Sequence, residues 1–270
     1  MIQRLPIFPT RLPIGILIFW FSNLSGQTIT QIHEFHAPAA HQAVAVDHQY
    51  FYAIGNRIIE KYDKQTGEFF LQWRDSSGIF KHLNSGVIID GKLYCAHSNF
   101  PDIPMASSIE IFDPVSLKPI DSHSFGIDIG SATWIDRYAG YWYVAFAHYN
   151  RFKDHTGTDN RWTQLVKFSD QWEKLASWIL PSDLLERFDG MSNSGGFIDG
   201  SGKIYITGHD YKEVYILEFP PHGYALQWID TLQAPFEGQG IAADPGQEGI
   251  IFGIQRSSKK VVAGKIETGK

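Results

Sequence analysis

The sequence predicts an all-β fold, a five-bladed β-propeller, from one repeated pattern and its spacing. The pattern is an apolar run, a turn with an aspartate and a second run ending in polar residues, as in NSGVIIDGKLYCAHSN, residues 84–99. Successive turn aspartates lie 43, 46, 63 and 45 residues apart, and a four-stranded propeller blade takes roughly 40–50 residues. Five repeats, and hence five blades, are marked by Asp47, Asp90, Asp136, Asp199 and Asp244.

The first strand of the mature chain is expected to close the last blade. Residues 28–36 alternate polar with apolar side chains, as a half-buried strand does. The last repeat supplies three strand-like runs, at 240–244, 250–255 and 261–266. Pairing residues 28–36 with this repeat would give it a fourth strand and leave no exposed edge where the chain ends meet.

The other elements follow from turn signals and alternation. Gln65-Thr66-Gly67 separates two alternating runs and predicts a hairpin, and two prolines keep the loop 100–106 out of the sheet. Residues 181–188 predict a short helix, with Ser182 or Asp183 as the N-cap. The outer strands are expected at residues 57–63, 69–75, 107–114, 119–125, 213–219 and 225–232.

The third repeat is the longest because residues 151–162 extend it after its second strand. Long loops on a rigid scaffold often carry function, so this one is interpreted as a lid or a ligand-binding loop, with a plain surface insertion as the alternative. The aromatic residues nearby fit a stacking platform for a sugar or planar ligand, or packing between blades. They are Trp134, Trp142, Tyr149, Phe152 and Trp162.

Residues 1–26 resemble a secretory signal peptide. Arg4 and Arg11 precede an apolar run at 12–21, and small polar residues follow it. The run is shorter than the roughly 20 residues of a membrane span, so an uncleaved anchor is the alternative. We therefore expect residues 27–270 to form a single domain that is secreted or periplasmic, monomeric and free of the membrane.

Composition excludes several classes of function. The chain of 270 residues is 43% hydrophobic, enough to bury a substantial core. Its 23 basic and 29 acidic residues occur without runs and give a net charge of −6, so we expect no nucleic-acid partner. Cys95 is the single cysteine, which excludes an intramolecular disulfide and a cysteine metal cluster.

Polar residues before each first strand and after each second strand are expected at one end of the propeller, because a hairpin returns to the end it left. We predict a binding site for a small-molecule or carbohydrate ligand at this channel mouth. The predicted ligand-binding residues are Asn56, Asn84, Asn99, Asn193, Glu237, Gln239 and Arg256.

Histidines are over-represented at this end. Imidazoles on different strands can bind a divalent metal, and a glutamine can complete the shell, so His97, His148, His209 and Gln255 are a candidate site for Zn, Mn or Ca. Two alternatives stay open: hydrogen bonding to loops and water, and metal-free acid–base catalysis. The three histidines fall three, five and four residues after Tyr94, Tyr143 and Tyr205, so their facing differs unless bulges correct it.

The function predicted from these residues is that of a metal-assisted lyase or isomerase acting on a small carbohydrate or organic acid. The metal would polarise a carbonyl or carboxylate while His41 or His82 removes a proton. Few carboxylates are expected at the mouth, which argues against two-carboxylate glycoside hydrolysis. The alternative is a non-catalytic propeller that binds a sugar, peptide or protein partner through the same face.

Several phrases resemble secreted bacterial propeller proteins labelled cycloisomerase-like: SGVIIDGKLYCAHSN, SSIEIFD, DSHSFG and GYWYVAFAHY. This resemblance, over residues 28–266, implies a propeller fold. SDLLERF followed by SGGFIDGSGKIYITGHDYKEVYILEF is similar to the helix and blade of five-bladed glutaminyl cyclotransferases, although HQAV stands where that family has Thr-Gln-Gly. The proposed metal site is similar in composition to the manganese site of propeller polysaccharide lyases, which has three histidines and a glutamine.

Overall fold

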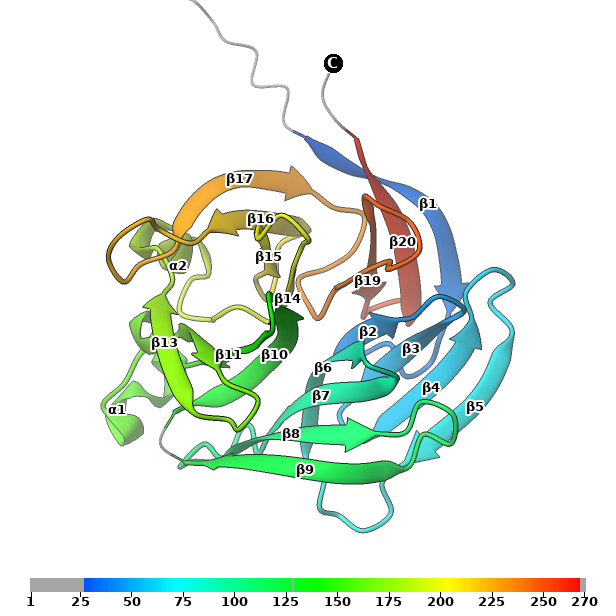
Figure 1. The fold of residues 1–270 in the computed structure, drawn as a ribbon, viewed down its shortest axis with the longest axis horizontal. Coiled ribbons are helices and arrows are strands. Elements are labelled where there is room, and N and C mark those ends of the chain that lie inside the picture. Colours follow the sequence, from blue (N-terminus) through cyan, green and yellow to red (C-terminus); the bar gives the residue numbers. More distant parts are fainter. Residues whose placement is uncertain (1–26, 128, 268–270) are drawn as a thin grey trace, which may run out of the picture.

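The computed structural model describes residues 27–127 and 129–267, which form twenty β-strands arranged around a central axis (Figure 1). The fold is an all-β propeller, as predicted. The predicted signal peptide at residues 1–26 lies outside the described residues. Within the described ranges, no helix is long and apolar enough to cross a membrane.

Three sheets are separate, and each consists of four consecutive antiparallel strands in sequence order from the axis outward. Each predicted hairpin unit supplies the two inner strands of its sheet. Their bounds are β2 (Ala43–Val46), β3 (Tyr50–Gly55), β4 (Ile58–Asp63) and β5 (Phe69–Arg74); β6 (His82–Ile89), β7 (Lys92–Ser98), β8 (Ser107–Phe112) and β9 (Pro119–Gly126); and β10 (Ser131–Tyr138), β11 (Tyr141–Ala147), β12 (Gln164–Phe168) and β13 (Lys174–Ile179).

The remaining strands form one sheet of eight, in the order β14-β15-β16-β17-β1-β20-β19-β18. Strand β1 pairs antiparallel with β20 along almost its whole length, as the N-terminal closure predicts. The bounds are β14 (Gly195–Ile198), β15 (Ile204–Thr207), β16 (Glu213–Glu218), β17 (Gln227–Gln233), β18 (Ala242–Ala243), β19 (Ile250–Gln255), β20 (Lys260–Glu267) and β1 (Thr28–His36).

The prediction of five separate blades therefore needs a correction, because the structure has four sheets. The eight-stranded sheet is two antiparallel groups of four joined by a single parallel pairing, Thr28 with Gln233. Thr28, the first residue of β1, pairs with Glu267 of β20 and also with Gln233, the last residue of β17. The pairing with Gln233 covers part of an edge that would otherwise be exposed.

The innermost strands form a closed ring in which β2 contacts β6, β6 contacts β10, β10 contacts β14, β14 contacts β18 and β18 contacts β2. Small residues allow this close approach. A Cβ on Gly240 would lie 2.3 Å from the Ala43 Cβ, and one on Gly195 would lie 2.4 Å from the Gly240 Cα. Larger side chains such as Phe51, Tyr52 and Trp134 fill the spaces between sheets and are almost fully buried. Burial of each such side chain stabilises the fold by about 1.5–3 kcal/mol.

The helices are short and lie outside the ring. Helix α2 (Ser182–Arg187) occupies the predicted stretch, but its N-cap is Pro181 and makes no side-chain capping bond, so the predicted Ser182 or Asp183 cap is wrong. Arg187 at its last turn binds Glu213 of β16 through two hydrogen bonds. The insertion predicted at 151–162 is ordered into single turns, η1 (Asn150–Phe152), α1 (Lys153–Thr156) and η2 (Asn160–Trp162).

Candidate functional site

A small cavity of about 80 Å³ lies where the innermost strands begin and the second strands end; we call it the mouth pocket. The segments that line it come from all three separate sheets and from both halves of the eight-stranded sheet. Its lining residues are Gln42, His82, Asn84, Phe100, Thr133, Tyr149, Met191, Ser194, His209, Gln239 and Arg256.

His82, a predicted catalytic residue, is the first residue of β6 and lines the mouth pocket. Its ring packs on Phe100, with 5.1 Å between the ring centroids. The pKa of His82 is lowered to about 4, chiefly by burial and also by charge repulsion from His97 and Arg256. The imidazole is therefore neutral at pH 7 and has a lone pair that can accept a proton.

Arg256 and Gln239 are among the polar side chains of the pocket that lack a protein partner in the described ranges. The backbone N–H of Arg256 donates to Glu237, but its guanidinium makes no hydrogen bond or ion pair within the described ranges. Gln239 is 4% exposed, and its backbone oxygen accepts from Thr207, whereas its side-chain amide has no partner among the same residues. A polar side chain that makes no hydrogen bond within the protein keeps its capacity to donate or accept one, so both side chains are suited to binding a polar ligand.

Two predicted ligand-binding asparagines support the pocket. Asn84 lines it, and its side-chain amide donates to the backbone oxygen of Ala132 at 2.7 Å. The Asn56 side-chain oxygen accepts from the Gln42 amide, also at 2.7 Å. Both asparagines therefore fix the pocket wall, and Asn56 acts through Gln42.

The other three predicted ligand-binding residues do not line the mouth pocket. Asn99 bonds twice to the backbone of its own loop and fixes the loop's shape. Glu237 accepts from the turn that follows β19. Asn193 is 1% exposed, and its side-chain oxygen has no partner in the described part of the chain. Asn99 and Glu237 therefore hold loops at the rim of the site.

The second predicted catalytic histidine, His41, is exposed and lies beside the mouth pocket without lining it. Its Nδ1 is 3.3 Å from the Gln42 side-chain nitrogen. Partial burial lowers the pKa of His41, and the charges of Arg256 and Lys259 lower it further. Of the two candidates, the structure places His82 in the cavity.

The predicted metal ligands do not converge, beginning with His97 and His148. His97 Nε2 accepts from the backbone N–H of Lys81 at 3.0 Å, and its Nδ1 lies 3.0 Å from the Ser108 hydroxyl. His148 lines a different cavity, where its Nδ1 lies 2.9 Å from the Thr158 hydroxyl. Ring nitrogens of both histidines thus lie within hydrogen-bond distance of nearby protein groups, at two separate places.

The other two predicted ligands are also apart. His209 lines the mouth pocket and pairs with Asp210 at 2.6 Å, whereas the Gln255 side chain donates to the backbone of Pro235. Within residues 27–127 and 129–267, no group of three or more His, Cys, Asp or Glu side chains could hold a metal ion. The structure thus does not bring His97, His148, His209 and Gln255 together, because each side chain bonds to a different neighbouring segment.

Phe100 and Met191 line the mouth pocket and carry no polar group that sequence reasoning could use to place them there. Phe100 directly follows Asn99, which was predicted at this end. Its position just after a second strand was therefore a signal that could have placed it at the mouth. Met191 follows the short helix and carries no pattern that marks a site. Tyr149, interpreted from sequence as a stacking or packing residue, lines the pocket as well.

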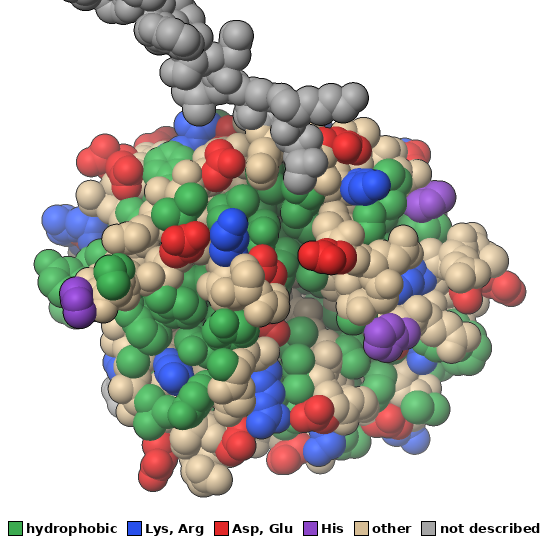
Figure 2. Space-filling model, turned by 45° about the horizontal axis from the view of Figure 1, so that its top comes forward, with side chains coloured by type: hydrophobic (Ala, Val, Ile, Leu, Met, Phe, Trp, Pro, Cys, Tyr) green, Lys and Arg blue, Asp and Glu red, His purple; other side chains and the backbone are tan. Residues whose placement is uncertain are grey.

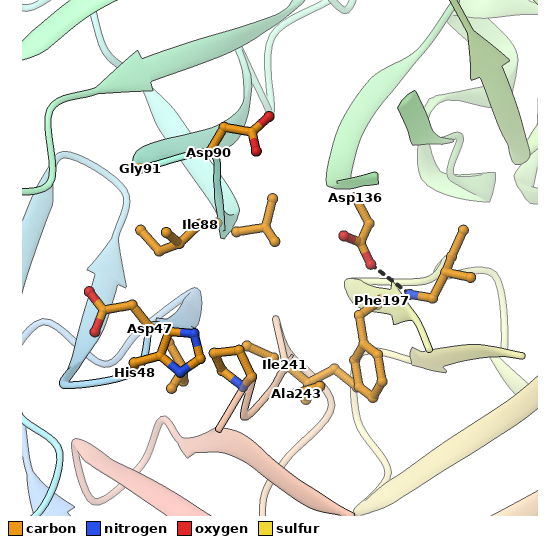
Figure 3. A pocket seen from close by; sticks show the side chains of 16 residues that line it. Asp47, His48, Ile88, Asp90, Gly91, Asp136, Phe197, Ile241 and Ala243 are labelled. Atoms are coloured by element: carbon orange, nitrogen blue, oxygen red, sulfur yellow. Dashed lines mark hydrogen bonds between the residues drawn. The ribbon is translucent and has the colours of Figure 1, made fainter. Parts of the chain in front are cut away.

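The opposite end of the ring also has a cavity, of about 360 Å³, which we call the turn-end pocket (Figure 3). Asp136 and Phe197 lie on one side of it and Asp47 and His48 on another. Asp136 accepts from the backbone N–H of Ile198 at 2.7 Å, and burial raises the pKa of its carboxyl group to about 6. Sequence reasoning used the turn aspartates as markers of the repeat and did not identify this pocket.

Charge on the outer surface does not point to a polyanionic partner. Figure 2 shows acidic and basic side chains interspersed over the face in view, without a large area of one sign. A nucleic-acid surface would concentrate lysine and arginine on one face. The surface in view is consistent with the absence of charge runs in the sequence.

Comparison with known proteins identifies a fold and not a family. No protein-family model matches the chain, and no curated protein matches its sequence. The structure is similar to Myxococcus xanthus glutaminyl cyclase, with a TM-score of 0.59 at 10% identity over 90% of this chain and 98% of that one. A luciferin-regenerating enzyme gives a TM-score of 0.52 at 10% identity, over 90% of this chain and 96% of that one. At such low identity these similarities show a propeller fold that enzymes also use.

Proposed function

We propose that the protein is an exported enzyme of lyase or isomerase type that acts on a small organic acid in the mouth pocket. One observation carries the proposal: the Arg256 guanidinium, which has no partner in the described ranges, and the neutral, partly buried imidazole of His82 line the same cavity. Arginine binds carboxylates through parallel hydrogen bonds, and a neutral imidazole can act as a general base. An organic acid fits this pair better than an uncharged sugar does.

The proposed reaction begins with proton removal beside the carboxylate. His82 takes the proton from the neighbouring carbon, and the electrons of that C–H bond move into the carboxylate, which becomes an enediolate. Arg256 stabilises the added negative charge. Return of the proton to another position gives an isomerase, and loss of a leaving group from the next carbon gives a lyase.

The low pKa of His82 is compatible with this role when the ligand is bound. A pKa of about 4 makes the free imidazole a weak base, and general-base catalysis is most effective when the pKa lies near the working pH. A bound anion favours the protonated form of a nearby imidazole and raises its pKa. We expect the bound substrate carboxylate to raise the pKa of His82 toward the pH at which the enzyme works.

The proposal assigns no role to a divalent metal, because the residues predicted to hold one lie in different surroundings.

For the architecture, we propose that the eight-stranded sheet counts as two blades, so that the propeller has five. The closed ring of five innermost strands supports this count. We also propose, from the sequence, that residues 1–26 direct export and that the protein is a monomer. The intact mass of the secreted protein should correspond to a chain that starts near residue 27, and light scattering should give the mass of one chain.

The test is exchange of the substrate α-hydrogen for deuterium in D2O, followed by NMR with a panel of small hydroxy and dicarboxylic acids. We expect exchange with at least one acid, loss of exchange with retained binding in His82→Gln, and binding at least tenfold weaker in Arg256→Gln. Lys259→Asn is the matched control, since Lys259 is an exposed cation in the same turn as Arg256 and does not line the pocket.

Two results would count against the proposal. If carboxylates bind equally well to Arg256→Gln, Arg256 is not their partner and the assignment of an organic acid to the mouth pocket is wrong. Carboxylate binding without exchange, with His82→Gln identical to the unsubstituted protein, would leave a non-catalytic propeller that binds its ligand through the same face.

A further inference from the structure

The mouth pocket is too small to enclose a whole ligand of ordinary size. Its volume is about 80 Å³, whereas ligand pockets usually measure about 300–1,000 Å³. A carboxylate and a few further atoms fill it. The rest of any larger ligand must therefore lie in a neighbouring space.

A second cavity of about 480 Å³ adjoins it, which we call the rim pocket. Tyr149 lines both cavities and forms part of the wall between them. The loop that provides Phe100 to the mouth pocket also provides Ile103 to the rim pocket. Two chain segments, the loop after β7 and the start of the long insertion after β11, thus build both sites.

A row of rings connects the two cavities. The Phe100 ring packs against His82, Tyr149 and Phe152, with centroid distances of 5.1, 5.2 and 5.9 Å. The Arg151 guanidinium lies 5.9 Å from the Phe100 centroid and 4.9 Å from that of Phe152. Phe152 lines the rim pocket. A ligand passing from one cavity to the other would follow an aromatic surface, which favours apolar groups.

The rim pocket itself is chemically suited to an apolar group. Within the described ranges, most of the side chains that line it are apolar or aromatic, and the polar ones are His148, His155, Thr156 and Thr158. The His148 ring is occupied, with Nδ1 at the Thr158 hydroxyl and Nε2 3.2 Å from the Ile129 oxygen. Ile103 and Ile127 line the cavity and are 38% and 56% exposed, so an apolar ligand would cover hydrocarbon that now faces water.

We propose that the substrate is an organic acid with an apolar arm, whose carboxylate occupies the mouth pocket and whose arm passes Tyr149 into the rim pocket. This inference rests on the proposed function, because it takes Arg256 as the carboxylate's partner. It assigns the loop after β7 and the long insertion to substrate selection.

The experiment is calorimetric titration of the mature protein with straight-chain carboxylates from acetate to octanoate and with 3-phenylpropanoate. Each added methylene that enters the rim pocket should tighten binding about threefold to fourfold. Ile103→Asp and Ile127→Asp should each abolish this gain and leave acetate binding unchanged. Val115→Asp is the matched control, because Val115 is 75% exposed and belongs to neither cavity.

The outcomes separate the two proposals. Affinity that depends on Arg256 but stays constant along the series would overturn the apolar arm and leave the organic-acid site in place. A chain-length gain that survives in both aspartate variants would overturn it too. If no carboxylate binds in an Arg256-dependent manner, the proposed function itself fails, and the inference fails with it.

Discussion

At the turn end of the ring, the aspartates of the repeats are held by protein partners, whereas at the mouth end two polar side chains meet none. Asp47 accepts from the Tyr52 hydroxyl, Asp136 from two backbone N–H groups and Asp244 from Lys64. At the mouth, Arg256 and Gln239 lack side-chain partners in the described ranges. The turn aspartates thus have protein partners, with one oxygen of Asp244 as the exception, whereas only some of the polar side chains at the mouth have them.

This difference separates stability from function. A polar group with protein partners contributes to folding, and its removal leaves the partner unsatisfied. An unsatisfied group contributes little to folding and retains its capacity for a ligand. Substitutions at the turn end should therefore lower stability, and substitutions at the mouth should lower ligand binding.

The largest expected effect is at the turn end, where Asp244→Asn removes the charge partner of Lys64. The Lys64 and Asp244 side chains are 9% and 1% exposed, and their charged atoms lie 2.8 Å apart. Breaking a buried pair on one side typically costs about 3–5 kcal/mol, so the free energy of unfolding in urea should fall by about that amount. Asp170→Asn, in an exposed pair with Arg137, is the control and should change it by less than about 1 kcal/mol. A small loss in both variants would contradict the structural role of the turn end.

The two ends should also respond to pH in opposite directions. Asp136 has a pKa of about 6 in the folded protein, above the ordinary value of 3.8, so its contribution to stability is present at low pH and lost as pH rises through 6. His82 has a pKa of about 4, below the ordinary 6.5, so its contribution is present above pH 6.5 and lost as pH falls toward 4. Each change is on the order of 3 kcal/mol at most.

Urea unfolding between pH 4 and 7 would measure these slopes. Asp136→Asn should remove the loss at rising pH, so that stability falls more steeply on acidification than in the unsubstituted protein. His82→Gln should remove the loss on acidification and change the slope in the opposite sense. Equal slopes in all three proteins would contradict the burial of both groups, and the exposed His222→Gln variant is the control.

The smallest expected effect is that of Arg256→Gln on stability. Because its guanidinium has no ion pair in the described structure, the free energy of unfolding should change by less than about 0.5 kcal/mol. Arg187→Gln is the comparison, since Arg187 binds Glu213 through two hydrogen bonds, and it should lose about 1–3 kcal/mol. A loss of that size in Arg256→Gln would show that Arg256 holds the fold together and weaken its assignment to a ligand.

The strands were predictable because their signals are local. Alternation in residues 28–36 and the aspartate turns of each repeat depend on neighbours in the chain, and the structure has strands at each of these places. The placement of polar residues at one end followed from hairpin geometry. His82, Asn84, His209, Gln239 and Arg256 line one cavity for that reason.

The facing of side chains was not predictable, because it depends on register and on partners far away in sequence. His97 and His148 end strands of the same kind as the one before His209, yet their rings meet Ser108 and Thr158 instead of one another. A shift of one residue turns a strand side chain to the opposite face, and sequence spacing leaves such shifts open. The predicted metal ligands therefore lie apart in the structure.

The sequence by itself determined the repeat, the all-β class and the end of the molecule where polar residues gather, because these depend on periodicity and on chain connectivity. The tertiary structure decided which of those residues share a cavity, which are held by protein partners and which are free for a ligand. It also joined two groups of strands through Thr28 and Gln233. The physical reason is that burial, register and hydrogen-bond partners are set by contacts between segments far apart in the chain.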